Sequence, residues 1–216
     1  MRFEDVLRRI EPLPADLPEG PAALIPVFVE TGAPRPRPSW GPASSSARPA
    51  AVLVLLFPGD DGEARLVLTE RTDRGGHHGG EVSFPGGRAE PEDDDIAATA
   101  LREAAEEVGL DPSACGARVL GTLTTQWIPV SNFTVTPVVA VASRRPLMRR
   151  QPTEVAAILE VPVAAFLPGA PLVAVEREIR GYALRYSAYP VDGLAVWGMT
   201  ARVLGGLGAW LGRDQG

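Results

Sequence analysis

Hydrophobic positions recur with helical spacing at the start of the chain. The residues concerned are Phe3, Val6, Leu7 and Ile10. This period predicts a short amphipathic helix over residues 2–11, which the following prolines end and which packs on the main domain. The same apolar face could instead serve a homodimer, and the pattern does not choose between these two roles.

Two apolar runs after residue 50 have the character of strands. Residues 51–57 are continuously apolar, and a turn-forming cluster at 58–62 separates them from a second run at 64–69. Together they predict a β-hairpin. Before them, residues 32–49 are rich in Pro, Ala, Ser and Arg, a composition that predicts a surface loop without catalytic function.

The remaining pattern mixes strands with helices. The predicted strands are an extended segment at 81–84, then 118–124, 133–142, and a strand with a turn at 176–186. The predicted helices are one that follows the acidic stretch 90–95 and ends near Val108, then 154–159 and 197–211. Gly109 suits the left-handed position after a helix end. This order favours an α/β fold, an α/β/α sandwich around a mixed β-sheet, in which residues 1–49 are helix and loop and 50–216 form the domain.

Composition excludes several classes of function. The chain has 216 residues with 21 basic and 27 acidic side chains, and its net charge of −6 gives no basic field for nucleic acid. Every basic residue is an arginine. The absence of lysine excludes a P-loop lysine, a Schiff-base lysine and a kinase-type ATP lysine. The single cysteine, Cys115, excludes an internal disulfide.

Nothing in the sequence predicts a membrane partner. The first residues lack the apolar core of a signal peptide, and no uninterrupted apolar run approaches the roughly 20 residues that span a bilayer. We therefore expect a soluble, cytoplasmic protein that acts on a small molecule and binds neither nucleic acid nor membrane.

The helix that ends near Val108 carries the residues most typical of catalysis. In a helical projection its apolar residues form one stripe, and Glu103, Glu106 and Glu107 lie roughly opposite, away from the core. Like charges at this spacing repel one another, so a bound cation gives the arrangement a physical reason. Hard oxygen ligands favour Mg²⁺ or Mn²⁺ over zinc. The alternative is an ordinary solvated acidic face.

The flanks of this helix favour a ligand site over that alternative. Pro85-Gly86-Gly87 provides a tight turn whose backbone can approach a metal or a phosphate closely. Arg102 stands beside the glutamates and can pair with Glu106 one turn later, which would orient the carboxylates.

These residues resemble the box of the Nudix family, which runs Gly, five residues, Glu, seven residues, Arg-Glu-apolar-x-Glu-Glu-x-Gly-apolar. Residues 102–110 match every defined position of the second half. In the first half, Asp94 stands where Glu is expected, and Gly87 lies one residue too far upstream. We expect Asp94 to cap the helix or to pair with Arg102.

The resemblance implies a Nudix-type sandwich and an Mg²⁺- or Mn²⁺-dependent hydrolase of diphosphate linkages. Glu103 and Glu107 would be the leading metal ligands, with Glu106 a further ligand or base and Gly87 a backbone ligand. Nudix enzymes often place the general base outside the box. Glu154 is the candidate here, and a structural glutamate at a helix start is the alternative interpretation.

Upstream of the box, residues 67–87 resemble the extra signature of the coenzyme A pyrophosphatase branch. That pattern reads Leu-Leu-Thr-x-Arg-Ser/Ala, three residues, Arg, three, Gly, three, Phe-Pro-Gly-Gly, and the spacing from Arg71 to Gly87 matches it without gaps. The sequence departs from it at Val67, Thr72 and Gly76. This resemblance implies hydrolysis of coenzyme A or its thioesters to 3′,5′-ADP and 4′-phosphopantetheine or its acyl form.

The residues expected to bind the substrate come from this region. They are Arg71, Arg74, His78, Gly80, Phe84, Pro85, Gly86 and Gly87. Arg74 is close enough to replace the arginine missing at Gly76. Trp127, Trp197 and Phe133 could stack an adenine, but aromatic residues at such positions more often belong to the core. Two other functions stay open: a Nudix pyrophosphatase acting on ADP-ribose or dinucleoside polyphosphates, and a catalytically silent nucleotide-binding module.

Overall fold

The computed structural model describes residues 1–35, 45–72, 80–129, 131–179 and 181–213. Its helices are α1 (Phe3–Ile10), α2 (Ile96–Val108), α3 (Pro112–Cys115) and α4 (Gly198–Leu211), with 3-10 turns η1 (Ala22–Leu24) and η3 (Val163–Phe166). Its strands are β1 (Val27–Phe28), β2 (Arg48–Pro58), β3 (Ala64–Arg71), β4 (Val82–Ser83), β5 (Gly86–Arg88), β6 (Ala117–Thr122), β7 (Gln126–Ile128), β8 (Phe133–Ala142), β9 (Val155–Pro162), β10 (Val173–Ile179), β11 (Tyr182–Val191) and β12 (Leu194–Val196).

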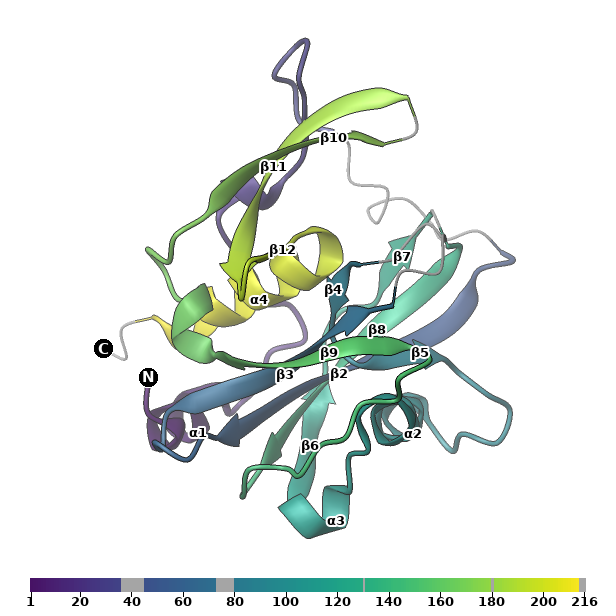
Figure 1. Ribbon diagram of the computed structural model, residues 1–216, viewed down its shortest axis with the longest axis vertical. Helices are drawn as coiled ribbons and strands as arrows, with labels where there is room; N and C mark the ends of the chain where they lie inside the picture. Colours follow the sequence, from purple (N-terminus) through teal and green to yellow (C-terminus); the bar gives the residue numbers. More distant parts are fainter. Residues whose placement is uncertain (36–44, 73–79, 130, 180, 214–216) are drawn as a thin grey trace.

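The larger sheet is mixed and is built around β2 (Figure 1). β2 pairs in parallel with β8 and antiparallel with β3 and β5. β3 extends the sheet through its antiparallel neighbours β9 and β4, and β8 extends it through β6 and β7. A parallel pair needs a long crossover between its strands, and α2 lies within the crossover that joins β2 to β8.

β2 is buried on both faces, which explains why its sequence is apolar without alternation. On one face, Leu53 and Leu55 share a core with Ala104 of α2. On the other face, Val54 and Leu56 belong to the larger core, to which α1 and α4 contribute. The sheet thus lies between helices, and the predicted α/β/α sandwich around a mixed sheet is confirmed.

The N-terminal helix uses its apolar face within the chain. Phe3, Val6 and Ile10 are buried in the larger core, as the helical spacing predicted, whereas Leu7, the fourth residue of the pattern, is exposed. α1 contacts both α4 and β3. This packing removes the reason to assign the same face to a homodimer.

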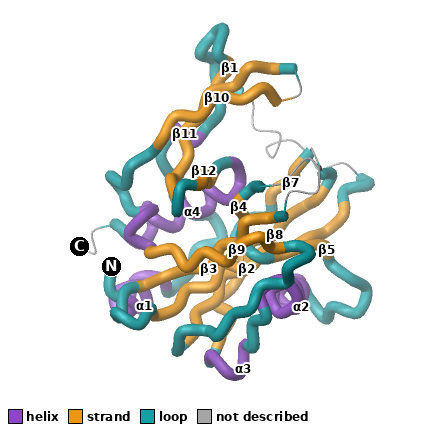
Figure 2. Tube along the Cα trace, viewed as in Figure 1, coloured by secondary structure: helices purple, strands orange, loops and turns teal. Residues whose placement is uncertain are grey.

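A smaller antiparallel sheet lies beside the larger one (Figures 1 and 2). It contains β1, β11 and β10 in that order, and β12 pairs with the other end of β11. β12 packs against β4 and leads directly into α4. The start of α4 is thereby brought to the edge of the larger sheet.

The predicted helix at 154–159 is wrong, because residues 155–162 form strand β9. β9 pairs antiparallel with β3, from Val155 opposite Arg71 to Pro162 opposite Arg65. Alanines and flanking glutamates make this segment resemble a short helix, but its β-branched residues fit the open edge of β3. The loop predicted at 32–49 also ends earlier, since β2 begins at Arg48. The hairpin and the C-terminal helix are confirmed within a few residues.

Candidate active site

The box glutamates lie on α2, whose ends are fixed by its own flanking residues. The Asp95 carboxylate accepts a hydrogen bond of 2.7 Å from the Ala98 backbone N–H and caps the first turn. Gly109 has a φ of 65° and ends the helix in the left-handed conformation, as predicted. α2 packs against β2 and β5, and this packing decides which of its side chains face the glycine turn.

Glu107 is buried, with 3% of its surface exposed. Its Oε2 accepts a hydrogen bond of 3.0 Å from the Gly86 backbone N–H, and its Oε1 lies 3.7 Å from Nη1 of Arg71. Burial raises the pKa of Glu107 to about 7, although the Gly86 N–H and the Arg71 charge oppose the rise. The prediction that all three glutamates face away from the core is therefore wrong for Glu107.

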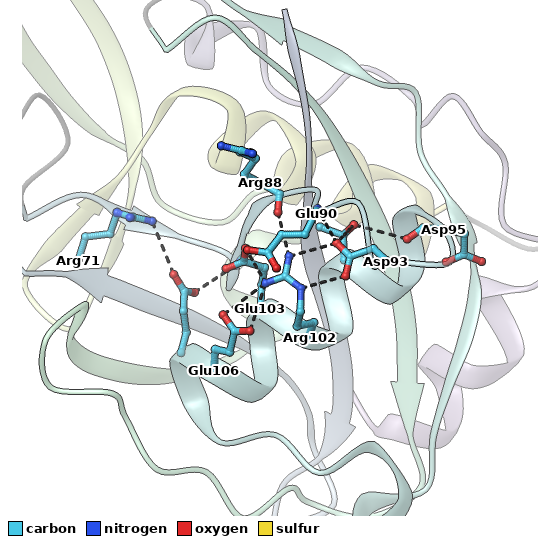
Figure 3. A network of polar contacts seen from close by, with 11 residues as sticks. Arg71, Arg88, Glu90, Asp93, Asp95, Arg102, Glu103 and Glu106 are labelled. Carbon is cyan, nitrogen blue, oxygen red and sulfur yellow. Dashed lines mark hydrogen bonds and ion pairs between the residues drawn. The ribbon is translucent and has the colours of Figure 1, made fainter.

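Arg102 is the centre of a polar network on α2 (Figure 3). Its Nε and Nη2 donate to the two carboxylate oxygens of Asp93 at 2.9 and 3.1 Å. Its Nη1 donates to Glu103 and Glu106 at 3.2 Å each, which confirms the predicted contact with Glu106. Nη2 also donates to the Arg88 carbonyl at 2.9 Å. One guanidinium thus ties two of the three glutamates to the loop before the helix.

Asp93, and not Asp94, is the acidic partner of Arg102. The Asp93 carboxylate also accepts hydrogen bonds from Thr99 Oγ1 at 2.8 Å and from the Glu90 backbone N–H at 2.9 Å. The hydrogen bond from Arg102 holds the pKa of Asp93 well below its usual range. The Arg102 guanidinium bonds to Asp93, the two glutamates and the Arg88 carbonyl, and within the described residues no contact joins it to Asp94, so the predicted pairing with Asp94 is wrong.

The spacing of the box contains the signal that identifies Asp93. Gly87 and Asp93 are separated by five residues, as the glycine and acidic residue of the family box are. The extra residue of this chain therefore lies between Asp93 and Arg102, and not between Gly87 and Asp94. The cap predicted for Asp94 is made by the next residue along the chain.

Glu103 lies directly against the glycine turn. β5 pairs with β2 and holds Gly87 opposite Ala51. A Cβ atom at Gly87 would lie 2.5 Å from the carboxylate of Glu103, so glycine is needed for that carboxylate to keep its position. Burial raises the pKa of Glu103, and the charge of Arg102 opposes this rise.

Glu154 lies in the turn before β9, within electrostatic range of Glu103 and Glu107. The Gln151 backbone N–H donates to the Glu107 carbonyl at 2.8 Å, and the Thr72 N–H donates to the Glu154 carbonyl at 2.9 Å. These bonds join the turn to α2 and β3. Burial is the main cause of the raised pKa of Glu103 and of Glu107. The negative charge of Glu154 adds a smaller contribution to both pKa values. Glu154 does not start a helix, because the strand β9 follows it.

Phe84 and Pro85 were predicted to contact the substrate, but both have a structural role. Phe84 is 1% exposed and belongs to the larger core, so its side chain offers no surface to a ligand. The Pro85 carbonyl accepts a hydrogen bond of 2.8 Å from the Leu53 backbone N–H. These two residues anchor the glycine turn to β2 and thereby place Gly86 and Gly87 beside the glutamates.

Gly80 stands where the chain returns to the sheet. It has a φ of 71°, and its N–H donates a hydrogen bond of 3.0 Å to the Arg71 carbonyl. It therefore supports the backbone of Arg71, the predicted phosphate-binding residue that contacts Glu107. Arg74 and His78, also predicted to bind substrate, lie outside the described residues.

The side chains at this site suit a hard divalent cation by their donor chemistry. Carboxylates with pKa values raised by burial and by one another's charge gain from a cation, which offsets both effects. Across the described ranges of the chain, no group of three or more His, Cys, Asp and Glu is gathered so as to hold a metal ion. Arg102 holds Glu103 and Glu106, and Arg71 and Gly86 hold Glu107. A cation must therefore compete with these partners.

Residues 47–179 match the family described as NUDIX domain, and the match includes α2, the glycine turn and Glu154. The chain belongs to the Nudix family. It is 38% identical over 161 residues to Nudix hydrolase 15, mitochondrial, of Arabidopsis thaliana. The aligned residues make up 72% of this chain and 55% of that protein. The chain spans about half the length of this plant relative and of Nudix hydrolase 22, chloroplastic, of which it covers 56%.

A bacterial Nudix protein is covered more fully. The chain is 33% identical over 171 residues to the uncharacterized Nudix hydrolase NudL of Yersinia enterocolitica, with 78% of this chain and 84% of that protein covered. A solved structure of a MutT/nudix family protein from Enterococcus faecalis has a TM-score of 0.50 at 14% identity. The match covers 77% of this Nudix chain and 62% of that chain, and it supports the fold alone. Within the described residues, no helix combines the length and apolar character needed to cross a membrane.

Proposed function

We propose that this Nudix chain is a pyrophosphohydrolase that cleaves the diphosphate bond of coenzyme A or its thioesters, with Mg²⁺ or Mn²⁺ as its cofactor. The observation that carries the proposal is the contact between Arg71 and Glu107. Arg71 belongs to the upstream signature of the coenzyme A branch, and Glu107 belongs to the Nudix box. The distance of 3.7 Å between Nη1 and Oε1 joins the two motifs in one site.

The box glutamates are the proposed holders of the cation. Glu107 is buried, and the side chain of Glu103 is 14% exposed, so these two carboxylates are shielded from bulk water. The side chain of Glu106 is 58% exposed and would complete the set from the solvent side. When bound, the cation neutralises the diphosphate, orients the attacking water and lowers its pKa.

Arg71 can exchange one anionic partner for another. Its side chain is 40% exposed and its contact with Glu107 is long, so this ion pair is weak and accessible. A phosphate oxygen offers the guanidinium a stronger, charge-assisted hydrogen bond. Transfer of Arg71 to the substrate would leave Glu107 free to bind the cation, which couples substrate binding to the assembly of the site.

Glu154 is the proposed general base. It lies in an exposed turn at the rim of the carboxylate cluster, where water has access to it. The water oxygen forms a bond to one phosphorus, the bond from that phosphorus to the bridging oxygen breaks, and the water proton passes to the carboxylate. For coenzyme A the products are 3′,5′-ADP and 4′-phosphopantetheine. Arg102, held by Asp93, keeps Glu103 and Glu106 oriented throughout.

One competition experiment tests the substrate. Purified protein is incubated with Mg²⁺ and equal concentrations of coenzyme A, ADP-ribose and a diadenosine polyphosphate, and the products are identified by mass. We expect 3′,5′-ADP to form first and chiefly from coenzyme A. Turnover of ADP-ribose with coenzyme A untouched would overturn the substrate, and no turnover of any compound would favour the silent nucleotide-binding module.

Two matched variants test the site in the same assay. Glu107→Gln keeps an acceptor for the Gly86 N–H but removes the charge, so we expect it to abolish most metal-dependent turnover. Glu92→Gln removes a carboxylate from the exposed loop before α2 and is expected to leave turnover unchanged. A fully active Glu107→Gln protein would contradict the assignment of the box.

A further inference from the structure

Trp197 and Tyr186 form a stacked aromatic pair outside the carboxylate cluster. Their ring centroids lie 5.2 Å apart with an interplanar angle of 25°. Tyr186, on β11, is 3% exposed, whereas Trp197, which directly precedes α4, is only partly buried. The guanidinium carbon of the exposed Arg177 lies 5.6 Å from the centre of the Trp197 ring. The tryptophan therefore has rigid support from Tyr186 and a solvent-accessible cation above its ring.

The tyrosine hydroxyl of this pair lacks a hydrogen-bond partner. Within the described structure, Tyr186 Oη is buried and unpaired, and so is Ser83 Oγ on β4. Buried hydroxyls nearly always have a partner, so an unpaired one marks a position that a bound water completes. Burial raises the pKa of Tyr186, while Arg177 lowers it and Glu81 raises it, so both charged residues lie within electrostatic range of the ring.

Strand β4 connects the aromatic pair to the candidate active site. β12, which immediately precedes Trp197, packs against β4, and β4 pairs with β3 through Ser83 opposite Thr69. The Glu81 carbonyl accepts a hydrogen bond of 3.0 Å from the Arg71 backbone N–H. The aromatic pair is thus one strand away from Arg71, the residue that contacts Glu107.

We propose that Trp197, Tyr186 and Arg177 form the subsite that binds the nucleobase of the substrate, an inference that rests on the proposed function. A purine would stack on the exposed part of the indole ring with the exposed Arg177 guanidinium displaced outward to cover it, while Tyr186 holds the indole in place. The sequence pattern favoured a core role for Trp197, but its partial exposure and its neighbours fit a binding surface better. This subsite selects nucleotide diphosphates over diphosphates that carry no base.

Binding of AMP and of ribose 5-phosphate tests this subsite without any turnover. The two probes share the sugar and the phosphate and differ by the base, and calorimetry without metal measures each affinity. We expect the unmodified protein to bind AMP about tenfold more tightly than ribose 5-phosphate, as one stacked base contributes. Trp197→Leu should remove this preference and leave ribose 5-phosphate binding unchanged, whereas Trp197→Phe should retain most of it.

A matched control and two milder variants keep the test decisive. Trp210→Leu removes a partly buried tryptophan from the opposite end of α4 and should preserve the preference for AMP. Arg177→Ala changes an exposed residue and should weaken AMP binding about threefold. This variant tests the subsite if Trp197→Leu does not fold. Tyr186→Phe keeps the ring that supports Trp197 and should leave both the preference for AMP and Tm unchanged, because the hydroxyl loses no partner within the described structure.

The outcomes separate this proposal from the proposed function. If Trp197→Leu folds and binds AMP as the unmodified protein does, the base subsite is overturned, even when coenzyme A is hydrolysed. If Trp197→Leu does not fold, unchanged AMP binding by Arg177→Ala overturns it. A preference for AMP that disappears with Trp197 supports the subsite even when no diphosphate is hydrolysed. In that case the hydrolase proposal fails alone.

Discussion

Arg102 and Asp93 form a bidentate ion pair, with Nε to Oδ1 and Nη2 to Oδ2 distances of 2.9 and 3.1 Å. The pair joins the loop before α2 to the middle of the helix. Bidentate geometry fixes the plane of a guanidinium as well as its position. The remaining Nη1 is thereby aimed at Glu103 and Glu106, so the loop determines how these carboxylates are presented.

Asp93→Asn should therefore lower activity through the orientation of the glutamates. The amide offers Arg102 one acceptor and no charge, and a small displacement of a reacting group costs about 10- to 100-fold in rate. We expect kcat/KM for the preferred substrate to fall by about this factor. Asp94→Asn, one residue away and exposed, is the control and should match the unmodified protein. Equal losses in both variants would contradict the assignment of Asp93.

Gly87→Ala should separate activity from stability. Its Cβ would lie 2.5 Å from the Glu103 carboxylate, which is the free end of a side chain and can move aside. We expect turnover to fall about tenfold or more while Tm changes little. Gly86→Ala instead places its Cβ 2.3 Å from the Ala51 carbonyl oxygen, which is backbone, and should cost about 1–3 kcal/mol of stability. Urea unfolding and turnover of both variants check the contrast, and similar stability losses would refute it.

The stability of the metal-free protein should fall as pH rises. Burial raises the pKa of Glu107 from 4.5 to about 7, so the folded state holds this proton more tightly than the unfolded chain. This stabilising contribution is complete below pH 4.5 and is lost as pH rises through 7. Glu107→Gln does not titrate. Between pH 5 and 8, we expect the unmodified protein to lose on the order of 2 kcal/mol relative to the variant.

Urea unfolding in a chelator, at several pH values, measures this difference. Excess Mg²⁺ should restore stability to the unmodified protein at pH 8 and restore less to Glu107→Gln, since a bound cation favours the ionised carboxylate. A difference between the two proteins that stays constant with pH would show that Glu107 does not change protonation in this range.

Glu154→Gln should lower kcat more than it changes KM. General base catalysis contributes about 10²- to 10⁴-fold, so we expect kcat to fall by at least the lower figure while KM changes little. Glu160→Gln is the matched control, because Glu160 lies on the β9 strand that follows Glu154 but is paired with Arg145. If Glu154→Gln keeps its full turnover, the base lies elsewhere.

Local patterns were sufficient where the physical cause is local. Helical spacing predicted the buried face of α1, and the run 51–57 predicted the central strand. The order of residues 102–110 predicted the helix, its left-handed end at Gly109 and the contact of Arg102 with Glu106. Each of these depends on neighbours within one or two turns of the chain.

Contacts between distant segments decided the rest. Strand β9 forms because β3 offers an open edge, which overrides the helical character of residues 154–159. Glu107 is buried because the glycine turn and Arg71 close over one side of α2, which a helical projection cannot represent. Trp197 is supported by Tyr186 because β12 folds back along β11 and places the start of α4 beside that strand.

By itself, the sequence determined the family, the helix that carries the glutamates and the hairpin of residues 51–69, since these follow from residue spacing along a helix or strand. The tertiary structure decided which glutamate is buried and where Glu154 lies. Those properties depend on desolvation and on hydrogen bonds between residues far apart in the chain, such as Gly86 and Glu107, and no local period encodes them.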